Sequence, residues 1–277
     1  MGICYTFSFP EELPDPKSIL IVAFPNKFIN RIKFSWKGGK VELILPPGYD
    51  IKETLRDESV RSCLKGFLDR NNYRLAPSRI PEKLLAVRSG LGEYGRNCLC
   101  YVEGMGSFQN LVVYYTDIPC SDDEWYELKV MDICGKCNIC RKSCPTGAIG
   151  DDRYLLHGEK CLTYLNERGD TFPGWEKCYD FNYGDYPEWA DMASHDCIIG
   201  CVKCQINCPR NKNLVTWYDY PDEFTEEETG IIISNTQPDS LPSGLVEKLE
   251  ECELYRYYPI IRYNLIAKLG LNTKYLL

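Results

Sequence analysis

The chain has no apolar stretch long enough to cross a bilayer, and no charged start with an apolar run follows Met1. We therefore expect neither a membrane span nor a secretory signal. Disulfides are then not expected either, which predicts a reducing, low-oxygen cytoplasm as the compartment. Histidine is scarce, with 2 in 277 residues. Both, His157 and His195, lie in the cysteine-rich part of the chain, and we expect them to be structural rather than metal ligands.

Positive charge is also in deficit, because 32 Lys and Arg face 40 Asp and Glu, giving a net charge of −8. Neutralisation of phosphates dominates nucleic-acid affinity, so nucleic acid is not expected as a partner. A stretch with few acids nevertheless carries a basic set: Arg70, Arg74, Arg79, Lys83, Arg88 and Arg96. Such a set is ordinarily a solvated helix surface. The alternative is a site for an anionic cofactor tail, substrate or partner.

Cysteine, in contrast, is abundant at 16 residues, and seven of them form two runs. The first run is C-x2-C-x2-C-x3-C-P and comprises Cys134, Cys137, Cys140 and Cys144. The second is C-x2-C-x3-C-P and comprises Cys201, Cys204 and Cys208. This spacing is typical of thiolate ligands to [4Fe–4S] clusters. Zinc is the alternative. A zinc ion needs four ligands, but it gives no reason for three thiolates at two-residue spacing that are followed by Cys-Pro. The sequence therefore predicts two [4Fe–4S] clusters and electron transfer.

Two clusters need eight thiolates, and the two runs supply seven. Cys161 is the predicted eighth ligand, with Cys178 and Cys197 as alternatives. Because the fourth cysteine of such a run ligates the other cluster, the sets should cross. One cluster would take Cys134, Cys137, Cys140 and Cys208. The other would take Cys144, Cys161, Cys201 and Cys204.

The pattern of apolar residues predicts an α+β protein in three parts. These are an N-terminal mixed α/β domain at 1–130, a ferredoxin-like double [4Fe–4S] cluster domain at 131–215, and an acidic connection with closing helices at 216–277. Short apolar runs predict strands at 18–24, 41–45 and 111–115. Helical spacing and terminal signals predict helices at 53–69, 81–90, 244–251 and 258–269. An aromatic-rich insertion at 171–189 should cover the clusters, and six acids at 219–229 should form an exposed connection.

A glycine-rich loop precedes the first cysteine run, with G-x-G-x-x-G at Gly90, Gly92 and Gly95. A dinucleotide site is not expected, because the loop follows a predicted helix rather than a strand. Glycine does allow a flat or bulky ligand to approach the backbone closely. A second small-residue loop, at Gly106 and Ser107, could flank the same ligand.

In order, the motifs G-L-G-x-x-G-x-N, G-S, T-D, the first cysteine run, K-C-L-T-Y and G-C-x2-C-Q-x2-C-P-x-N resemble the epoxyqueuosine reductases. More distantly they resemble the cobalamin-dependent reductive dehalogenases. The resemblance covers about 89–211. It implies that one cluster lies near a cobalamin whose reduced cobalt attacks or reduces the substrate, while the second cluster passes electrons in. It also implies a set of cobalamin contacts: Gly90, Gly92, Gly95, Asn97, Gly106 and Ser107.

Three departures from this family shape the predicted function. Ala76 stands where the family carries a proton-donating Asp, Lys83 replaces an Arg, and most of the helical-repeat tail that helps to hold tRNA is missing. We therefore expect a cobalamin-dependent reductase of an unidentified small molecule rather than of tRNA. Tyr94, Lys83 and Asp117 are the candidate catalytic acids.

The alternative is an electron-transfer protein without substrate chemistry of its own, which delivers electrons to a partner's corrinoid or flavin. The predicted partners are an electron donor such as ferredoxin or flavodoxin and a small-molecule or protein-bound corrinoid. The 130-residue domain ahead of the clusters favours the reductase, because a simple ferredoxin needs no such domain.

Overall fold

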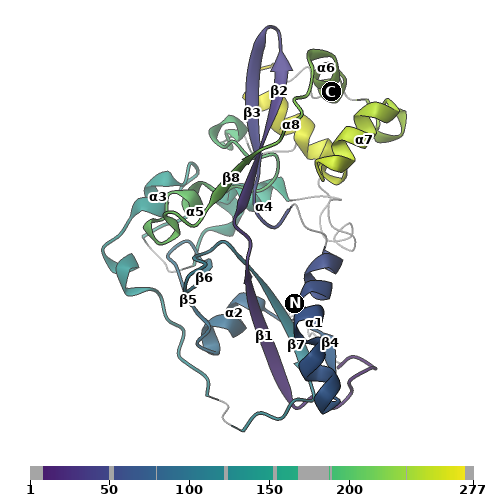
Figure 1. Ribbon diagram of the computed structural model, residues 1–277. Coiled ribbons are helices and arrows are strands. Elements are labelled where there is room, and N and C mark those ends of the chain that lie inside the picture. Colours follow the sequence, from purple (N-terminus) through teal and green to yellow (C-terminus); the bar gives the residue numbers. More distant parts are fainter. Residues whose placement is uncertain are drawn as a thin grey trace, which may run out of the picture. The chain divides into compact units, whose positions relative to one another are not determined.

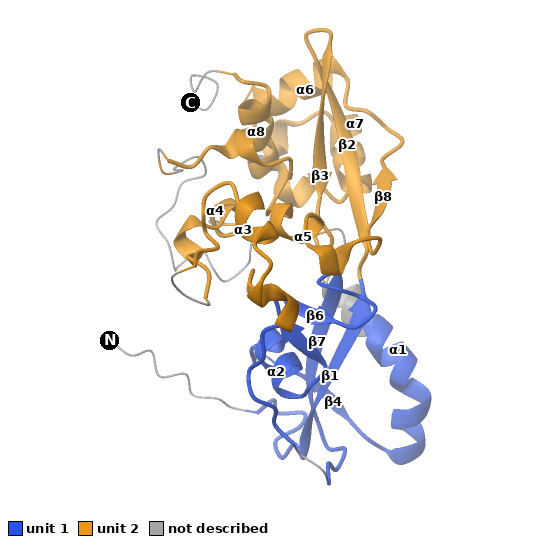
Figure 2. Ribbon diagram, turned by 90° about the vertical axis from the view of Figure 1, so that its left-hand side faces the viewer, with its two compact units in different colours: residues 1–25, 51–95, 99–131 blue, residues 26–50, 96–98, 132–277 orange. Residues whose placement is uncertain are grey.

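The chain forms two separate three-stranded sheets and one two-stranded hairpin in the computed structural model, which describes residues 9–49, 53–78, 80–121, 124–151, 155–167, 187, 189–234 and 236–271. Each three-stranded sheet belongs to a different compact unit (Figure 2). Unit 1 comprises 1–25, 51–95 and 99–131, and unit 2 comprises 26–50, 96–98 and 132–277. This division differs from the three predicted ranges: 26–50 lies in unit 2, and 216–277 lies in the same unit as the cysteine runs.

The sheet of unit 1 has the antiparallel strand order β1 (Ser18–Pro25), β7 (Gln109–Thr116) and β4 (Leu75–Pro77). Helices α1 (Glu53–Asn71) and α2 (Glu82–Arg88) lie on opposite sides of these strands (Figure 2). In β1, Leu20 and Val22 pack in one apolar cluster with Leu64 and Leu68 of α1. The intervening Ile21 and Ala23 pack with Ala86 and Val87 of α2. Two covered faces explain why β1 reads as a continuous apolar run.

The glycine-rich loop forms a small hairpin of β5 (Gly92–Tyr94) and β6 (Cys100–Val102). Gly90 ends the preceding turn with φ +76°, a conformation that glycine adopts without steric cost. The G-x-G-x-x-G pattern therefore shapes a helix end and a hairpin in unit 1.

The sheet of unit 2 has the order β3 (Gly39–Leu45), β2 (Phe28–Trp36) and β8 (Thr216–Asp219). β2 and β3 form an antiparallel hairpin, whereas β8 pairs with β2 in parallel (Figure 1). Three helices share an apolar core with this sheet: α6 (Glu226–Ile233), α7 (Ser243–Glu251) and α8 (Tyr258–Lys268). In that core the Phe34 and Phe224 rings stack with centroids 4.7 Å apart.

The cysteine runs lie on short helical turns joined by loops. The turns are η1 (Asp132–Gly135), α3 (Ile139–Ser143), η2 (Gly158–Lys160), α4 (Leu162–Asn166), η3 (Met192–Ser194), α5 (Lys203–Ile206) and η4 (Pro209–Asn211). Two further turns, η5 (Pro238–Ser240) and η6 (Tyr255–Tyr257), precede α7 and α8. None of the helices in the described ranges is long and apolar enough to cross a membrane.

The acidic segment at 219–229 is largely exposed, as its charge predicts, but only 220–225 is a connection. Its first residue closes β8, and its last four begin α6. Thr225 and Glu228 form a capping box, and acidic side chains stabilise the positive end of a helix. The predicted aromatic insertion at 171–189 lies almost entirely outside the described residues.

Candidate functional site

Each cysteine run winds through short helical turns and then extends at its last thiol. Cys134 lies in η1 and Cys140 in α3, after which Cys144 is extended, with φ −76° and ψ 113°. In the second run Cys204 lies in α5, and Cys208 is extended with φ −72° and ψ 127°. A proline follows each extended cysteine and disfavours helix at the residue before it. In both runs the last cysteine therefore lies on extended backbone, just past the helical turn that precedes it.

The first group of thiols comprises Cys134, Cys137, Cys140 and Cys208. Burial, together with smaller contributions from the nearby Cys134, Cys208 and Cys137, raises the pKa of Cys140 to about 11. Burial also raises the pKa of Cys134, to which Cys208 and Cys137 contribute. Because charges influence each other only at short range, these four thiols lie together although Cys208 comes from the other run.

The second group comprises Cys144, Cys161, Cys201 and Cys204. Burial raises the pKa of Cys201 to about 11, with Cys161 and Cys144 as its neighbouring thiols. Burial and then Cys201 raise the pKa of Cys204, and Cys161 adds to the effect. Cys161 is extended, with φ −74° and ψ 123°, so it repeats the backbone conformation of Cys144 and Cys208.

The two groups have the membership that the crossed pattern predicts, and they adjoin each other, because Cys140 also raises the pKa of Cys204. Among the described side chains, no three His, Cys, Asp or Glu residues converge closely enough to hold a single metal ion. A [4Fe–4S] cluster sets another requirement, since each thiolate binds an iron at its own corner. In each group the four thiols are close enough to shift one another's pKa values, as a cluster with one thiolate per iron needs. Cluster binding at both groups stays a prediction.

The alternative eighth ligand Cys197 is only 1% exposed and belongs to the segment that runs beside β3. Its N–H donates to Nδ1 of His195 at 3.1 Å. Burial raises the Cys197 pKa, and the nearby Cys201 thiol adds to the effect. Cys197 is thus adjacent to the second group but already packed in the protein interior. Cys178 lies outside the described residues.

Two of the predicted cobalamin contacts face their own chain. A Cβ added at Gly90 would lie 2.9 Å from the Tyr126 ring, and one at Gly92 would lie 2.7 Å from Sγ of Cys100. Gly95 donates its N–H to the Leu99 carbonyl at 2.9 Å, which closes the hairpin turn. Packing therefore accounts for Gly90 and Gly92 without a bound ligand, whereas Gly95 lies at the hairpin turn.

The other predicted contacts lie in two separate places. Gly106 has φ +60° and exchanges two backbone hydrogen bonds with Val102, both 2.9 Å, in the loop that contains Ser107. Asn97 belongs to unit 2, is 3% exposed, and makes a side-chain hydrogen bond to the Cys204 thiol. Sequence reasoning selected Asn97 for a cobalamin, whereas the structure places it against a cysteine of the second group.

The three candidate acids differ in their surroundings. Asp117 accepts the N–H of Arg74 at 2.7 Å and pairs with its guanidinium at 2.9 Å, and these hydrogen bonds lower the Asp117 pKa. It is therefore ionised at neutral pH and cannot donate a proton there. Tyr94 packs with the apolar cluster beneath α2. Lys83 is exposed on α2.

The described members of the basic set are divided between the two units, and several of them have partners of their own. Arg74 pairs with Asp117, and Arg88 lies 3.9 Å from Glu127 and stacks near the Trp125 ring. Arg96 lies in unit 2, and Arg79 lies outside the described residues.

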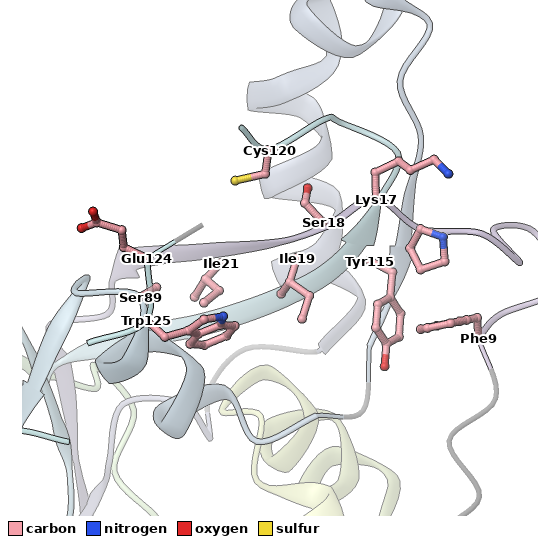
Figure 3. A pocket seen from close by; sticks show the side chains of 11 residues that line it. Phe9, Lys17, Ser18, Ile19, Ile21, Ser89, Tyr115, Cys120, Glu124 and Trp125 are labelled. Atoms are coloured by element: carbon pink, nitrogen blue, oxygen red, sulfur yellow. The ribbon is translucent and has the colours of Figure 1, made fainter. Parts of the chain in front are cut away.

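Unit 1 also contains a cavity of about 330 Å³ that the sequence did not reveal (Figure 3). Ile19 and Ile21 of β1 form its apolar floor, and its walls include Tyr115 and Trp125. The Phe9 and Tyr115 rings meet edge to face at 5.3 Å. None of the predicted catalytic or cobalamin residues lines this cavity. The alternation in β1 indicates which residues form the floor, but the aromatic walls come from separate segments, with Tyr115 in β7 and Trp125 in a loop.

No protein-family model matches the chain. Among curated proteins, an epoxyqueuosine reductase of Listeria monocytogenes is 28% identical over 216 residues, which are 74% of this chain and 51% of that protein. One of Cyclobacterium marinum is 33% identical over 165 residues, or 58% of this chain and 47% of that protein. The chain spans about half the length of the curated relatives it matches.

Solved structures agree at the level of the fold. An epoxyqueuosine reductase from Bacillus subtilis, with its catalytic aspartate loop swung out of the active site, has a TM-score of 0.59 at 21% identity, covering 94% of this chain and 66% of that one. One solved with an epoxyqueuosine-modified tRNA stem-loop has a TM-score of 0.61 at 23% identity, with the same coverage. Sequence and fold together show that this mixed α/β chain is similar to the epoxyqueuosine reductases, which are oxidoreductases.

Proposed function

We propose that this chain is an iron–sulfur oxidoreductase that reduces a modified nucleoside in tRNA. The observation that carries the proposal is the pair of adjoining thiol groups, each with four cysteines drawn from crossed runs. Its support is the likeness to epoxyqueuosine reductases, one of which was solved with a modified tRNA stem-loop.

This proposal replaces two predictions that are wrong. The predicted reduction of an unidentified small molecule, with electron delivery to a partner as its alternative, conflicts with relatives that are named epoxyqueuosine reductases. The prediction that nucleic acid is not a partner conflicts with the tRNA stem-loop in a related structure. That prediction relied on the net charge, which averages over the whole chain, whereas phosphate binding depends on local charges.

The thiol groups would hold two [4Fe–4S] clusters in a ferredoxin-like arrangement, with one thiolate on each iron. Reduction of an epoxide to an alkene consumes two electrons and two protons and releases the oxygen as water. Two adjoining clusters can deliver those electrons one at a time. The chain must also supply protons, and the position of the family's acid is occupied by Ala76, which is fully buried in β4.

Of the candidate acids, we propose Lys83 as the proton donor. Asp117 is held ionised by Arg74, and Tyr94 packs in an apolar cluster, whereas Lys83 is exposed. Replacing Lys83 by Met should lower turnover without changing the iron content. An unchanged rate would remove Lys83 from the reaction.

Cobalamin is a cofactor that the resemblance implies, and the described glycine positions offer it limited support. Gly90 and Gly92 already contact Tyr126 and Cys100, while a Cβ at Gly104 would meet no atom within 4 Å. Gly90 and Gly92 therefore have contacts within their own chain that account for them, cobalamin binding stays a prediction, and no reaction step is derived through it. Titration of the protein with cobalamin, followed by visible absorption, tests binding separately from activity.

The activity test uses anaerobically purified protein with a counted iron content. The protein is reduced with dithionite and incubated with an epoxyqueuosine-modified tRNA stem-loop, with and without added cobalamin. Mass spectrometry of the digested nucleosides should show queuosine. A Cys204→Ser variant is the control for electron supply through the clusters. Cluster-loaded wild-type protein that forms no queuosine in either condition would overturn the proposal.

A further inference from the structure

The segment 96–98 contacts both thiol groups of unit 2. The Arg96 guanidinium donates to the Cys134 carbonyl at 2.9 Å. The backbone N–H of Arg96 also hydrogen-bonds to the Cys134 thiol. The next residue, Asn97, hydrogen-bonds through its side chain to the Cys204 thiol. Two consecutive residues therefore each contact one cysteine, and the two cysteines belong to different groups.

Local structure holds this segment in place. Cys98 has φ +59°, which is uncommon for a residue other than glycine, and its Sγ accepts the N–H of Leu156 at 3.3 Å. Asn97 is 3% exposed, so water does not compete for its amide. Asp151 lies 3.9 Å from the Arg96 guanidinium and also pairs with Arg141. The contacts thus come from fixed, partly buried groups rather than from mobile surface side chains.

Hydrogen bonds to cluster sulfurs and nearby charge are two of the factors that set the reduction potential of an iron–sulfur cluster. Reduction adds negative charge to the cluster and its thiolates. A donor N–H or a guanidinium beside a thiolate stabilises that charge more in the reduced state than in the oxidised state. Such a contact therefore raises the potential of the cluster that it touches.

We propose that Arg96 and Asn97 are positioning residues that set the reduction potentials of the two clusters independently. Arg96 raises the potential of the cluster held by Cys134, and Asn97 raises that of the cluster held by Cys204. The inference rests on the proposed binding of two clusters. It assigns Asn97 to a cluster thiolate instead of to a cobalamin.

The test compares Arg96→Leu and Asn97→Leu with wild type in a potentiometric titration followed by electron paramagnetic resonance. Asn97→Asp is a second variant of nearly the same shape, in which a carboxylate replaces the amide donor. Asn207→Leu is the matched control. Asn207 lies in the same cysteine run as Cys204, but its side chain donates to the Lys203 carbonyl at 2.8 Å. Iron and sulfide are counted in every sample.

We expect Asn97→Leu to lower the midpoint potential of one cluster and Arg96→Leu to lower that of the other. Asn97→Asp should lower the same midpoint as Asn97→Leu, and by more. Asn207→Leu should change neither. The inference is overturned if the iron content is full and neither midpoint moves, or if both variants move the same one. Wild-type protein that binds no iron would instead overturn the proposed function.

Discussion

Gly200 immediately precedes Cys201 and has φ +68°, in the left-handed region. A Cβ at this position would lie 2.7 Å from the Tyr49 hydroxyl, which hydrogen-bonds to Glu167. Two independent constraints thus require glycine here. Both act on the backbone that presents a thiol of the second group.

Replacing Gly200 by Ala should therefore destabilise the protein by more than the roughly 1–2 kcal/mol of left-handed backbone strain alone. Gly147→Ala is the matched control, because Gly147 has φ +66° and no atom within 4 Å of the added Cβ. Urea unfolding of both variants measures the difference. Equal losses of unfolding free energy in the two variants would show that Tyr49 moves aside without destabilising the protein.

His195 is the second residue whose environment predicts a measurable effect. Burial, followed by the positive charge of Lys268, lowers the His195 pKa to about 4. Its neutral Nδ1 accepts the Cys197 N–H, which favours the uncharged ring. Because protons bind the unfolded ring more readily, the stabilisation is complete above the unfolded pKa of about 6.5 and is lost as pH falls toward 4.

The full loss should be about 3 kcal/mol over that window. His195→Gln cannot titrate, so its unfolding free energy should fall less than that of wild type between about pH 7.5 and about pH 5. Chemical unfolding at several pH values provides the comparison. Parallel curves for the two proteins would contradict this account of His195.

At the scale of elements, local patterns predicted several strands and helices well. β1, β7, α1 and α8 all lie close to their predicted bounds, because continuous apolar runs and helical spacing reflect local burial. The parallel partner of β2 could not be predicted, since β8 is a short, exposed strand far along the chain. Acidity concealed α6, although the Thr225–Glu228 capping box was readable in the sequence.

The candidate site shows the same contrast. Thiol spacing predicted which cysteines gather, since local turns determine where each run directs its side chains. The place of Asn97 beside Cys204 was not predictable, because a small-residue loop gives no indication of its distant neighbours. The cavity in unit 1 was missed for the same reason, as its walls come from separate segments.

The cap of α6 gives a prediction for a single element. Oγ1 of Thr225 accepts the Glu228 N–H at 3.2 Å, and the Glu228 carboxylate accepts the Thr225 N–H at 2.7 Å. Thr225→Ala should cost about 1 kcal/mol. Ser243→Ala, at the exposed start of α7 where no cap hydrogen bond forms, should cost less. Thermal or urea unfolding distinguishes the two, and equal effects would argue against the cap.

For the whole molecule, the two thiol groups predict about eight irons and eight sulfides per chain. Cys161→Ser should lose one cluster and leave the other's spectrum largely intact. Cys197→Ser is the paired variant: it should keep both clusters, because Cys197 is packed against His195 in the interior. Iron analysis and electron paramagnetic resonance read out both. The opposite pattern would make Cys197 the eighth ligand.

Loss of the clusters should affect the two units unequally. The cysteine turns are short and have little apolar core of their own, whereas unit 1 has apolar clusters on both faces of its sheet. In cluster-free protein, amide hydrogen exchange should accelerate over 132–167 and 201–212, whereas β1 and β7, and the segment 196–199 that pairs with β3, should stay protected. Equal protection in the presence and absence of iron would contradict this expectation.

The strand order of unit 2 also bears on synthesis at the ribosome. β2 and β3 leave the ribosome before both cysteine runs, whereas β8, the parallel partner of β2, follows them. The hairpin must therefore remain with one edge unpaired while most of the chain is still being translated. An unpaired edge is a template for unwanted pairing with other chains. Slow translation, or a shortage of iron during translation, should therefore increase aggregation of the nascent protein.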